Sequence, residues 1–137
     1  MRIILPCLIF FLIFLCVQVN GQYNKPLYTW ESHLAYQQGF EITQSEDFIY
    51  YANQFAIIRV DKEETSLRFY TKIEGLSESG IAEIAFDPYR KQLVIAYNSG
   101  NIDFLQEETG DIINVPDFKL NTTFPDKTIR EIEVTDN

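Results

Sequence analysis

His33 is the single histidine of the chain, so it is the first residue to consider for catalysis. Ser32 precedes it, but side chains at neighbouring strand positions point to opposite faces, which prevents a nucleophile–base pair. A metal site would need His33 and carboxylates from distant turns, and no ligand-spaced motif accompanies it. We expect His33 to be a turn or rim residue near Trp30. The sequence therefore predicts no enzyme, no metal and no cofactor.

Asp103 is the next candidate, because it follows Ile102 within a strand that would ordinarily carry an apolar residue there. It could line a central channel, but the favoured interpretation is an outward-facing or hairpin-bonded carboxylate. The acidic pairs Glu63-Glu64 and Glu107-Glu108 fall in expected hairpin loops and are interpreted as solvated charges. Glycoside hydrolysis requires two carboxylates held at a fixed separation, and nothing in the sequence makes a pair converge.

Tyrosines recur along the expected strands. Rigid rings with a polar tip suit contacts to glycan or protein, so they are interpreted as candidates for an exposed contact surface. Strand alternation places about half of such rings in the core. The candidates are Tyr50, Tyr51, Tyr70, Tyr89 and Tyr97.

The N-terminus is typical of a secretory signal peptide. Arg2 is followed by an apolar stretch over residues 3–17 and then by small residues. We expect cleavage after Gly21, which leaves residues 22–137 as the mature chain. The alternative is an uncleaved membrane anchor, but the stretch is shorter than the roughly 20 residues that span a bilayer. An exported protein of the periplasm or outer-membrane surface of a Gram-negative bacterium is the expectation.

Both cysteines, Cys7 and Cys16, lie in this leader, so the mature chain has neither disulfides nor thiolate metal sites. The chain has 11 basic and 20 acidic residues, and the basic ones form no cluster. Phosphate recognition depends on cationic patches, so a nucleic-acid partner is not expected. Stability must come from the packing of a core.

The mature chain reads as short β-strands separated by turns, with no sustained helical period. Leu67–Ile73 alternates well, with Arg68, Tyr70 and Lys72 facing away from Leu67, Phe69, Thr71 and Ile73. The expected strands are Tyr28–Trp30, Phe40–Thr43, Phe48–Ala52, Phe55–Val60, Leu67–Ile73, Ile81–Phe86, Leu93–Tyr97, Asn101–Leu105, Ile112–Val115 and Ile129–Val134.

These strands repeat as a unit. Tyr51–Gln54 aligns with Ala96–Ser99 at a shift of 45, and Ile81–Ile84 aligns with Ile129–Ile132 at a shift of 48. A four-stranded unit of about 40–50 residues is typical of β-propeller blades. The alternative is a generic antiparallel meander whose self-similarity is coincidental.

The predicted fold class is an all-β, incomplete β-propeller of four-stranded antiparallel blades, preceded by the signal peptide. The predicted parts are a blade at 37–75, a blade at 80–118 and the start of another at 128–135. Since propellers close with roughly 4–8 blades, we expect an N-terminal fragment of a longer protein. Its exposed blade faces would make it self-associate, and Tyr28–Trp30 would be a closing strand for the last blade.

Two sequence stretches resemble the N-terminal propeller of PorZ-type proteins of the Bacteroidetes, which are components of the type IX secretion system. One is the Gly-Leu-Ser stretch with its following strand, the other the Ser-Gly-Asn-Ile-Asp stretch, and the lead-in Trp-Glu-Ser-His also fits. The residues that carry the resemblance, interpreted as structural, are Trp30, His33, Gly75, Leu76, Ser77, Ile81, Ile84, Asp87, Gly100, Asn101 and Asp103.

The resemblance implies a non-catalytic binding and assembly module in a cell-surface complex. Its implied partners are other secretion-system proteins (a sortase-like surface protease among them), lipopolysaccharide glycan, and the remaining blades of the full-length chain. The implied role is attachment of secreted cargo to anionic lipopolysaccharide. The alternative is a propeller of a periplasmic two-component sensor, a related family that shares the Gly-Leu-Ser element. That family usually continues with a Trp-Ile-Gly-Thr-like strand, where this chain has Val94–Tyr97.

Overall fold

The computed structural model describes residues 38–135. These residues form eight strands and one short helix. The elements are β1 (Gly39–Gln44), β2 (Phe48–Asn53), β3 (Ile57–Asp61), β4 (Leu67–Tyr70), β5 (Ile81–Asp87), β6 (Gln92–Tyr97), β7 (Ile102–Gln106), β8 (Ile112–Val115) and α2 (Asp117–Leu120).

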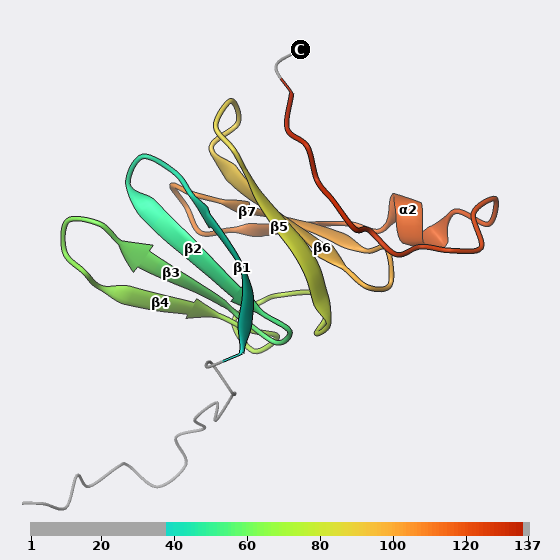
Figure 1. Cartoon of the computed structure of the whole chain (residues 1–137), viewed down its shortest axis with the longest axis horizontal. Coiled ribbons are helices and arrows are strands. Elements are labelled where there is room, and N and C mark those ends of the chain that lie inside the picture. The colour runs from blue at the N-terminus through green and yellow to red at the C-terminus, as the bar shows by residue number, and fades with distance from the viewer. Residues whose placement is uncertain (1–37, 136–137) are drawn as a thin grey trace, which may run out of the picture. The chain divides into compact units, whose positions relative to one another are not determined.

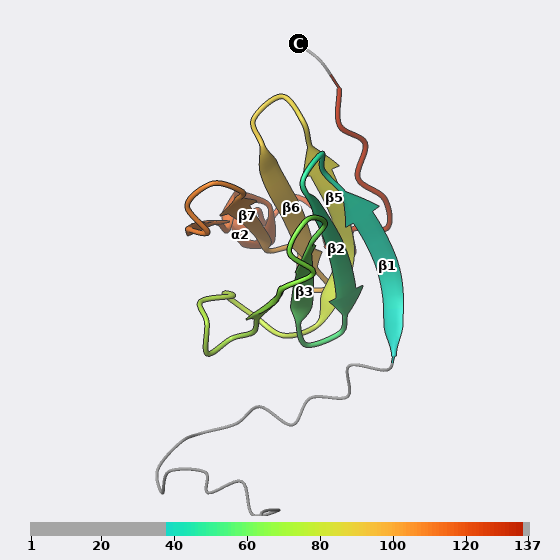
Figure 2. The same cartoon turned by 90° about the vertical axis from the view of Figure 1, so that its left-hand side faces the viewer.

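The strands pair in sequence order into two four-stranded antiparallel sheets, β1–β4 and β5–β8, which we call blade 1 and blade 2 (Figure 1). Short polar hairpins connect the strands, as the turn residues predict. The two sheets lie face to face, with blade 1 in front of blade 2 in the second view (Figure 2). The described part of the chain has two such units and no closed barrel, which confirms the predicted incomplete β-propeller.

The two blades are built on one pattern. Each first strand has a bulge at the same place, between Gly39 and Glu41 in β1 and between Ile81 and Glu83 in β5. A bulge inserts one unpaired residue and increases the local twist of the strand. Glu41 and Glu83 therefore occupy equivalent positions on β1 and β5, the first strands of the two blades.

The strand registers correct the predicted repeat by one residue. Asn53 N–H donates to the Ala56 carbonyl, whereas Tyr97 N–H donates to the Asn101 carbonyl, so the second turn is one residue longer. Ala52 consequently matches Ala96, not Tyr97, although Ile57 still matches Ile102. The correction matters because a slip of one residue moves every side chain of a strand to the opposite face.

The core lies between the facing sides of the two blades. Blade 1 contributes Tyr50, Ala52, Ile57 and Tyr70, and blade 2 contributes Ile84, Leu93, Ile95, Tyr97 and Leu105. Tyr50 also stacks on Phe86 of β5, with ring centroids 5.8 Å apart. Full burial of one such apolar side chain stabilises a fold by about 1.5–3 kcal/mol, so this interface holds the two blades together.

The alternation predicted for Leu67–Ile73 is present over β4, and the side with Tyr70 is the buried one. Leu67 and Ile73 are exposed, whereas Tyr70 is buried and the strand ends there. β4 is the outer strand of blade 1, and the side that carries Tyr70 is the one that blade 2 covers. Alternation was therefore present, but the apolar side of the strand faces away from the described core.

Two further expectations differ from the structure. Residues 121–135 contain no strand, so Ile129–Val134 does not form the expected first strand of another blade. The helix α2 was not predicted, since four residues give too short a window for a helical period. The signal peptide, the expected strand Tyr28–Trp30, and His33 lie outside the described residues. Within residues 38–135 no helix is long and apolar enough to cross a membrane.

Candidate functional site

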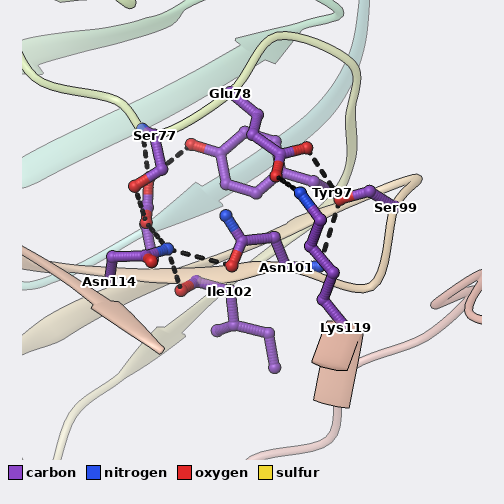
Figure 3. A network of polar contacts seen from close by, with 9 residues as sticks. Ser77, Glu78, Tyr97, Ser99, Asn101, Ile102, Asn114 and Lys119 are labelled. Atoms are coloured by element: carbon purple, nitrogen blue, oxygen red, sulfur yellow. Dashed lines mark hydrogen bonds and ion pairs between the residues drawn. The ribbon is translucent and has the colours of Figure 1, made fainter. Parts of the chain in front are cut away.

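The connection between the blades is fixed by one buried carboxylate. Residues 71–80 lead from β4 to β5 and include Ser77, which Figure 3 labels. Asp103 of β7 meets this connection at Ser77. The Ser77 backbone N–H donates to Asp103 Oδ2 at 2.8 Å, and its hydroxyl donates to Oδ1 at 2.7 Å. Leu76, the preceding residue, is buried in the core. The connection is thus held by one apolar anchor and one polar anchor.

Two blade 2 side chains complete the environment of this carboxylate. The Tyr97 hydroxyl donates to Asp103 Oδ2 at 2.6 Å, and Asn114 Nδ2 donates to Oδ1 at 2.8 Å. Burial, together with the hydrogen bond and charge of Asp103, raises the pKa of Tyr97 well above its ordinary value. Each carboxylate oxygen accepts two hydrogen bonds, which is its ordinary capacity. Ser77, Tyr97, Asp103 and Asn114 are called the linker network below.

A second polar cluster lies beside the linker network. Glu78 accepts hydrogen bonds from the Lys119 ammonium of α2 and from the Ser99 hydroxyl of the β6–β7 turn, the latter at 2.7 Å (Figure 3). Partial burial opposes ionisation of Glu78, but Lys119 and Ser99 outweigh it and lower the pKa of this carboxyl. Asn101 is buried and accepts from Asn114 at 3.0 Å. The cluster ties the segment after β8 to the β4–β5 connection.

Gly100 allows the close approach of this later segment. Its φ of 81° lies in the left-handed region, where residues with a Cβ are strained. A Cβ there would also lie 2.8 Å from Cβ of Lys127 and 3.1 Å from the Phe118 ring. The family-motif glycine therefore serves both the turn and the contact with the segment after β8.

Asp87 organises the turn between β5 and β6. Its Oδ1 accepts the backbone N–H groups of Tyr89 and Arg90 at 2.9 and 3.1 Å, and its Oδ2 lies 3.3 Å from the Arg90 guanidinium. Burial favours the neutral acid, but the Arg90 and Tyr89 hydrogen bonds together lower the pKa of Asp87. The Asp87 carboxylate therefore caps the turn over residues 87–90.

A second set of contacts between the blades involves Tyr50, Arg59 and Glu107, and we call it the latch. The Tyr50 hydroxyl of β2 donates to Glu107 Oε1 at 3.1 Å, and Arg59 Nη1 of β3 donates to the Glu107 carbonyl at 3.1 Å. Arg59 also lies over the Phe48 ring, 4.2 Å from its centroid. Burial and the neighbouring Glu107 raise the pKa of Tyr50. Glu107 is buried, so its interpretation as a solvated loop charge was wrong.

Glu83 of β5 lies near two other carboxylates, that of Glu41 in β1 and that of Glu131 in the segment after β8. Burial and the charges of Glu41 and Glu131 raise the pKa of Glu83, so these three groups share one region. Beside it, a solvent-open cavity of about 470 Å³ is lined by Phe40, Ile81, Glu83 and Arg130 among others. Within the described residues, no group of three or more His, Cys, Asp or Glu side chains is arranged to hold a metal ion.

Some residues of the predicted family motif therefore lie close together in the structure, and the others lie elsewhere. Ser77 and Asp103 meet in the linker network, Asn101 accepts a hydrogen bond from its Asn114, and Gly75 and Leu76 precede Ser77 in the β4–β5 connection. Ile81 and Ile84 belong to the core, Asp87 caps a distant turn, and Trp30 and His33 lie outside the described residues. Of the two forms of the favoured interpretation of Asp103, the outward-facing one was wrong, because its side chain is completely buried. The carboxylate instead accepts a hydrogen bond from Asn114 across the β7–β8 hairpin.

Sequence reasoning missed Tyr97 and Asn114 as partners of Asp103. Asn114 interrupts the apolar strand β8 directly opposite Asp103 of β7. Polar residues in neighbouring strands that pair across the sheet were the available signal. Of the five tyrosines proposed for a contact surface, about half were expected in the core: Tyr50, Tyr70 and Tyr97 are buried, Tyr51 is half-buried and Tyr89 is exposed.

Eight short antiparallel strands in two blades, with a polar anchor that fixes the connection between them, define a β-propeller segment. A family comparison matches residues 49–137 to the PorZ N-terminal β-propeller domain of the type IX secretion system (TSS9). The chain belongs to this family.

A solved structure is similar as well. It is PorZ of Porphyromonas gingivalis, described as an essential bacterial surface component of the type IX secretion system. The similarity has a TM-score of 0.63 at 32% identity, over 69% of this chain and 13% of the PorZ chain. The chain thus matches only a small part of that protein's length. A comparison with curated proteins found no match.

Proposed function

We propose that this chain is a non-catalytic binding and assembly module of a type IX secretion complex at the outer surface of a Gram-negative cell. Its role there is to help attach secreted cargo to anionic lipopolysaccharide. The partners are other secretion-system proteins, including a sortase-like surface protease, and the lipopolysaccharide glycan. The exported state follows from the predicted leader, residues 1–21.

The observation that supports a binding role is the saturation of Asp103. This is the most deeply buried carboxylate of the family motif, and all of its acceptor capacity is taken up by Ser77, Tyr97 and Asn114. A general base or metal ligand needs a lone pair that faces substrate or metal. The Asp103 carboxylate thus fixes a connection between blades, which suits a rigid scaffold for contacts.

The test is a deletion of the coding region in the bacterium, followed by complementation with the wild-type gene. Loss of lipopolysaccharide-modified cargo from the cell surface, restored by the wild type, is expected. A second strain complemented with the Asp103→Ala variant reports whether the rigid connection is needed. Normal cargo attachment in the deletion strain would contradict the proposal. A changed transcriptional response with intact cargo attachment would favour the sensor alternative.

A further inference from the structure

The solvent-open cavity beside Glu83 has a volume of about 470 Å³, and we call it the blade cavity. Sites for small ligands ordinarily measure roughly 300–1,000 Å³. Its walls come from β1, the β2–β3 turn, β5, the β6–β7 turn and the segment after β8. Both blades therefore contribute to one cavity that is large enough for a small ligand or a protein side chain.

The two β-bulges supply residues to the blade cavity. Phe40 is the extra residue of the bulge in β1, and Ala82 is the extra residue of the bulge in β5. Both residues line the cavity. Bulges are frequent beside functional sites, because they redirect a side chain away from the regular alternation of a strand. Blade 1 has an aromatic ring at this position and blade 2 only a methyl group, so the second bulge fills less of the space.

Hydrogen bonds between the blades hold one side of the cavity in place. The Gln54 carbonyl accepts from the backbone N–H groups of Gly80 and Ile81 at 2.7 and 3.1 Å. Asn98 donates to the Gly80 carbonyl from its backbone N–H and from its side-chain Nδ2, both at 2.9 Å. The β2–β3 turn, the start of β5 and the β6–β7 turn are thus joined to one another. This side of the cavity is formed before any ligand binds.

Two phenylalanine side chains of the lining are exposed, Phe40 to 48% and Phe55 to 42%. The turn that carries Phe55 is fixed by Asn53, whose Oδ1 accepts the backbone N–H groups of Phe55 and Ala56, both at 2.8 Å. The faces of aromatic rings carry partial negative charge, which attracts a cation. The aromatic part of the lining therefore favours a positively charged ligand over an anion.

Glu83 adds a carboxylate to which, within residues 38–135, no hydrogen-bond donor or cation is paired. Burial and the charges of Glu41 and Glu131 raise its pKa, so its surroundings oppose the ionised form. Among the lining residues that the structure describes, Arg130 carries the only positive charge, and its guanidinium lies 3.5 Å from Asp126. A cation in the blade cavity would supply the positive charge that Glu83 lacks.

We propose that the blade cavity binds an organic cation, an ammonium or guanidinium group, through Phe40, Phe55 and Glu83. The ring faces and the carboxylate each attract such a group, and the carboxylate also accepts its hydrogen bonds. This chemical group occurs in free amines and in the lysine and arginine side chains of proteins. The net charge of −9 favours the approach of either. The inference depends on the lining of the cavity and not on the proposed role in secretion.

The test titrates the isotope-labelled exported chain with four probes and follows its amide signals by NMR. The cationic probes are butylammonium and the acetylated, amidated peptide Gly-Lys-Gly. The uncharged probes are the same peptide with norleucine in place of lysine, and maltose. Saturable shifts at Ala82, Glu83 and Asn98 are expected with both cations and not with the uncharged probes. Tighter binding of the lysine peptide than of butylammonium identifies a protein side chain as the ligand, and the reverse order identifies a free amine.

Three variants test the residues that carry the proposal. Glu83→Gln keeps the shape of the side chain and should weaken the binding of both cations about tenfold or more, because a hydrogen bond to a charged group is lost. Phe40→Leu and Phe55→Leu keep apolar surface but remove a ring face, and each should weaken binding roughly 2–5-fold. Glu64→Gln is the matched control, because it removes the same charge from an exposed residue of the β3–β4 hairpin and should change binding less than about twofold. Circular dichroism and thermal melting verify that each variant is folded.

Three results would overturn the proposal: no saturable binding of either cation to the wild type, equal binding of the lysine and norleucine peptides, or equal weakening by Glu83→Gln and Glu64→Gln. Tighter binding of maltose than of the two cations would also overturn it, and would identify a sugar site. None of these measurements involves secreted cargo, so this proposal and the proposed function fail separately.

Discussion

The Ser77 hydroxyl donates to Asp103 Oδ1 at 2.7 Å across 26 positions of the sequence. One residue belongs to the connection between the blades and the other to the third strand of blade 2. The contact therefore fixes where the chain crosses from one blade to the next. Since Asp103 is fully buried, its effect on stability is large enough to measure.

Replacement of Asp103 by alanine should lower the free energy of unfolding by roughly 2–4 kcal/mol. The substitution leaves the buried Tyr97 hydroxyl and the Ser77 N–H without an acceptor, and each orphaned buried group costs about 1–3 kcal/mol. Urea denaturation at a fixed protein concentration measures the change. Asp111→Ala is the matched control, because Asp111 is an exposed hairpin residue and should change stability by less than about 0.5 kcal/mol. Equal effects of the two substitutions would contradict the assigned role of Asp103.

The sequence allowed the blades to be predicted because their signals are local. Strand alternation, turn residues such as Asp87-Pro88 and Ser99-Gly100, and a four-strand period each depend on a few neighbouring residues. The family motif also located both halves of the linker network, near Ser77 and near Asp103. Prediction at this level needs no knowledge of which side of a sheet is covered.

The facing of individual residues could not be predicted in the same way. Tyr70 and Leu67 lie on opposite sides of β4, and both sides are apolar enough to be a core. Which side is buried depends on where blade 2 packs, and that is a long-range property. The one-residue difference between the β2–β3 and β6–β7 turns was also not predictable from local signals, because it changes which side of a strand faces the core without a change in the strand's composition.

The latch should be measurable as a coupling between Tyr50 and Glu107. Tyr50→Phe keeps the ring stacked on Phe86 and removes only the hydroxyl that donates to Glu107, so a loss of about 1 kcal/mol is expected. Glu107→Ala should cost more, because it also uncovers buried surface. In the double variant the two losses should fall short of additive by at least about 0.5 kcal/mol.

The adjacent glutamate supplies the control for the latch. Glu108 is exposed and pairs only loosely with Lys91, at 3.8 Å. Exposed pairs contribute about 0–1 kcal/mol, so Glu108→Ala should leave stability nearly unchanged. Additive effects of Tyr50→Phe and Glu107→Ala in urea denaturation would show that the two side chains do not interact in solution.

Gly100→Ala should destabilise blade 2 and loosen the segment after β8. The positive φ of 81° disfavours any residue with a Cβ by about 1–2 kcal/mol, and the new methyl group would contact Lys127 and Phe118. Hydrogen exchange should show faster exchange over residues 117–127 in the variant, with a smaller change in blade 1. A control is Gly110→Ala, whose positive φ is similar but whose neighbour is the Arg68 side chain of blade 1. If both variants loosened residues 117–127 equally, the assigned contact would be wrong.

Glu83 gives the chain a pH dependence of defined sign. Burial and the charges of Glu41 and Glu131 raise the pKa of Glu83 in the folded chain above its unfolded value. The folded state therefore binds this proton more tightly than the unfolded state. Its contribution to stability is complete below the unfolded pKa and is lost as the pH rises through the folded pKa.

Glu83→Gln removes the charge, so the variant should be more stable than the wild type near pH 7, by less than about 1 kcal/mol for a partly exposed group. This difference should vanish as the pH falls to about 4, in the range of an ordinary glutamate pKa. Thermal melting of both proteins between these pH values measures it. A Glu83→Gln variant that is less stable than the wild type at neutral pH would show that the carboxylate is stabilised, not crowded, by its surroundings.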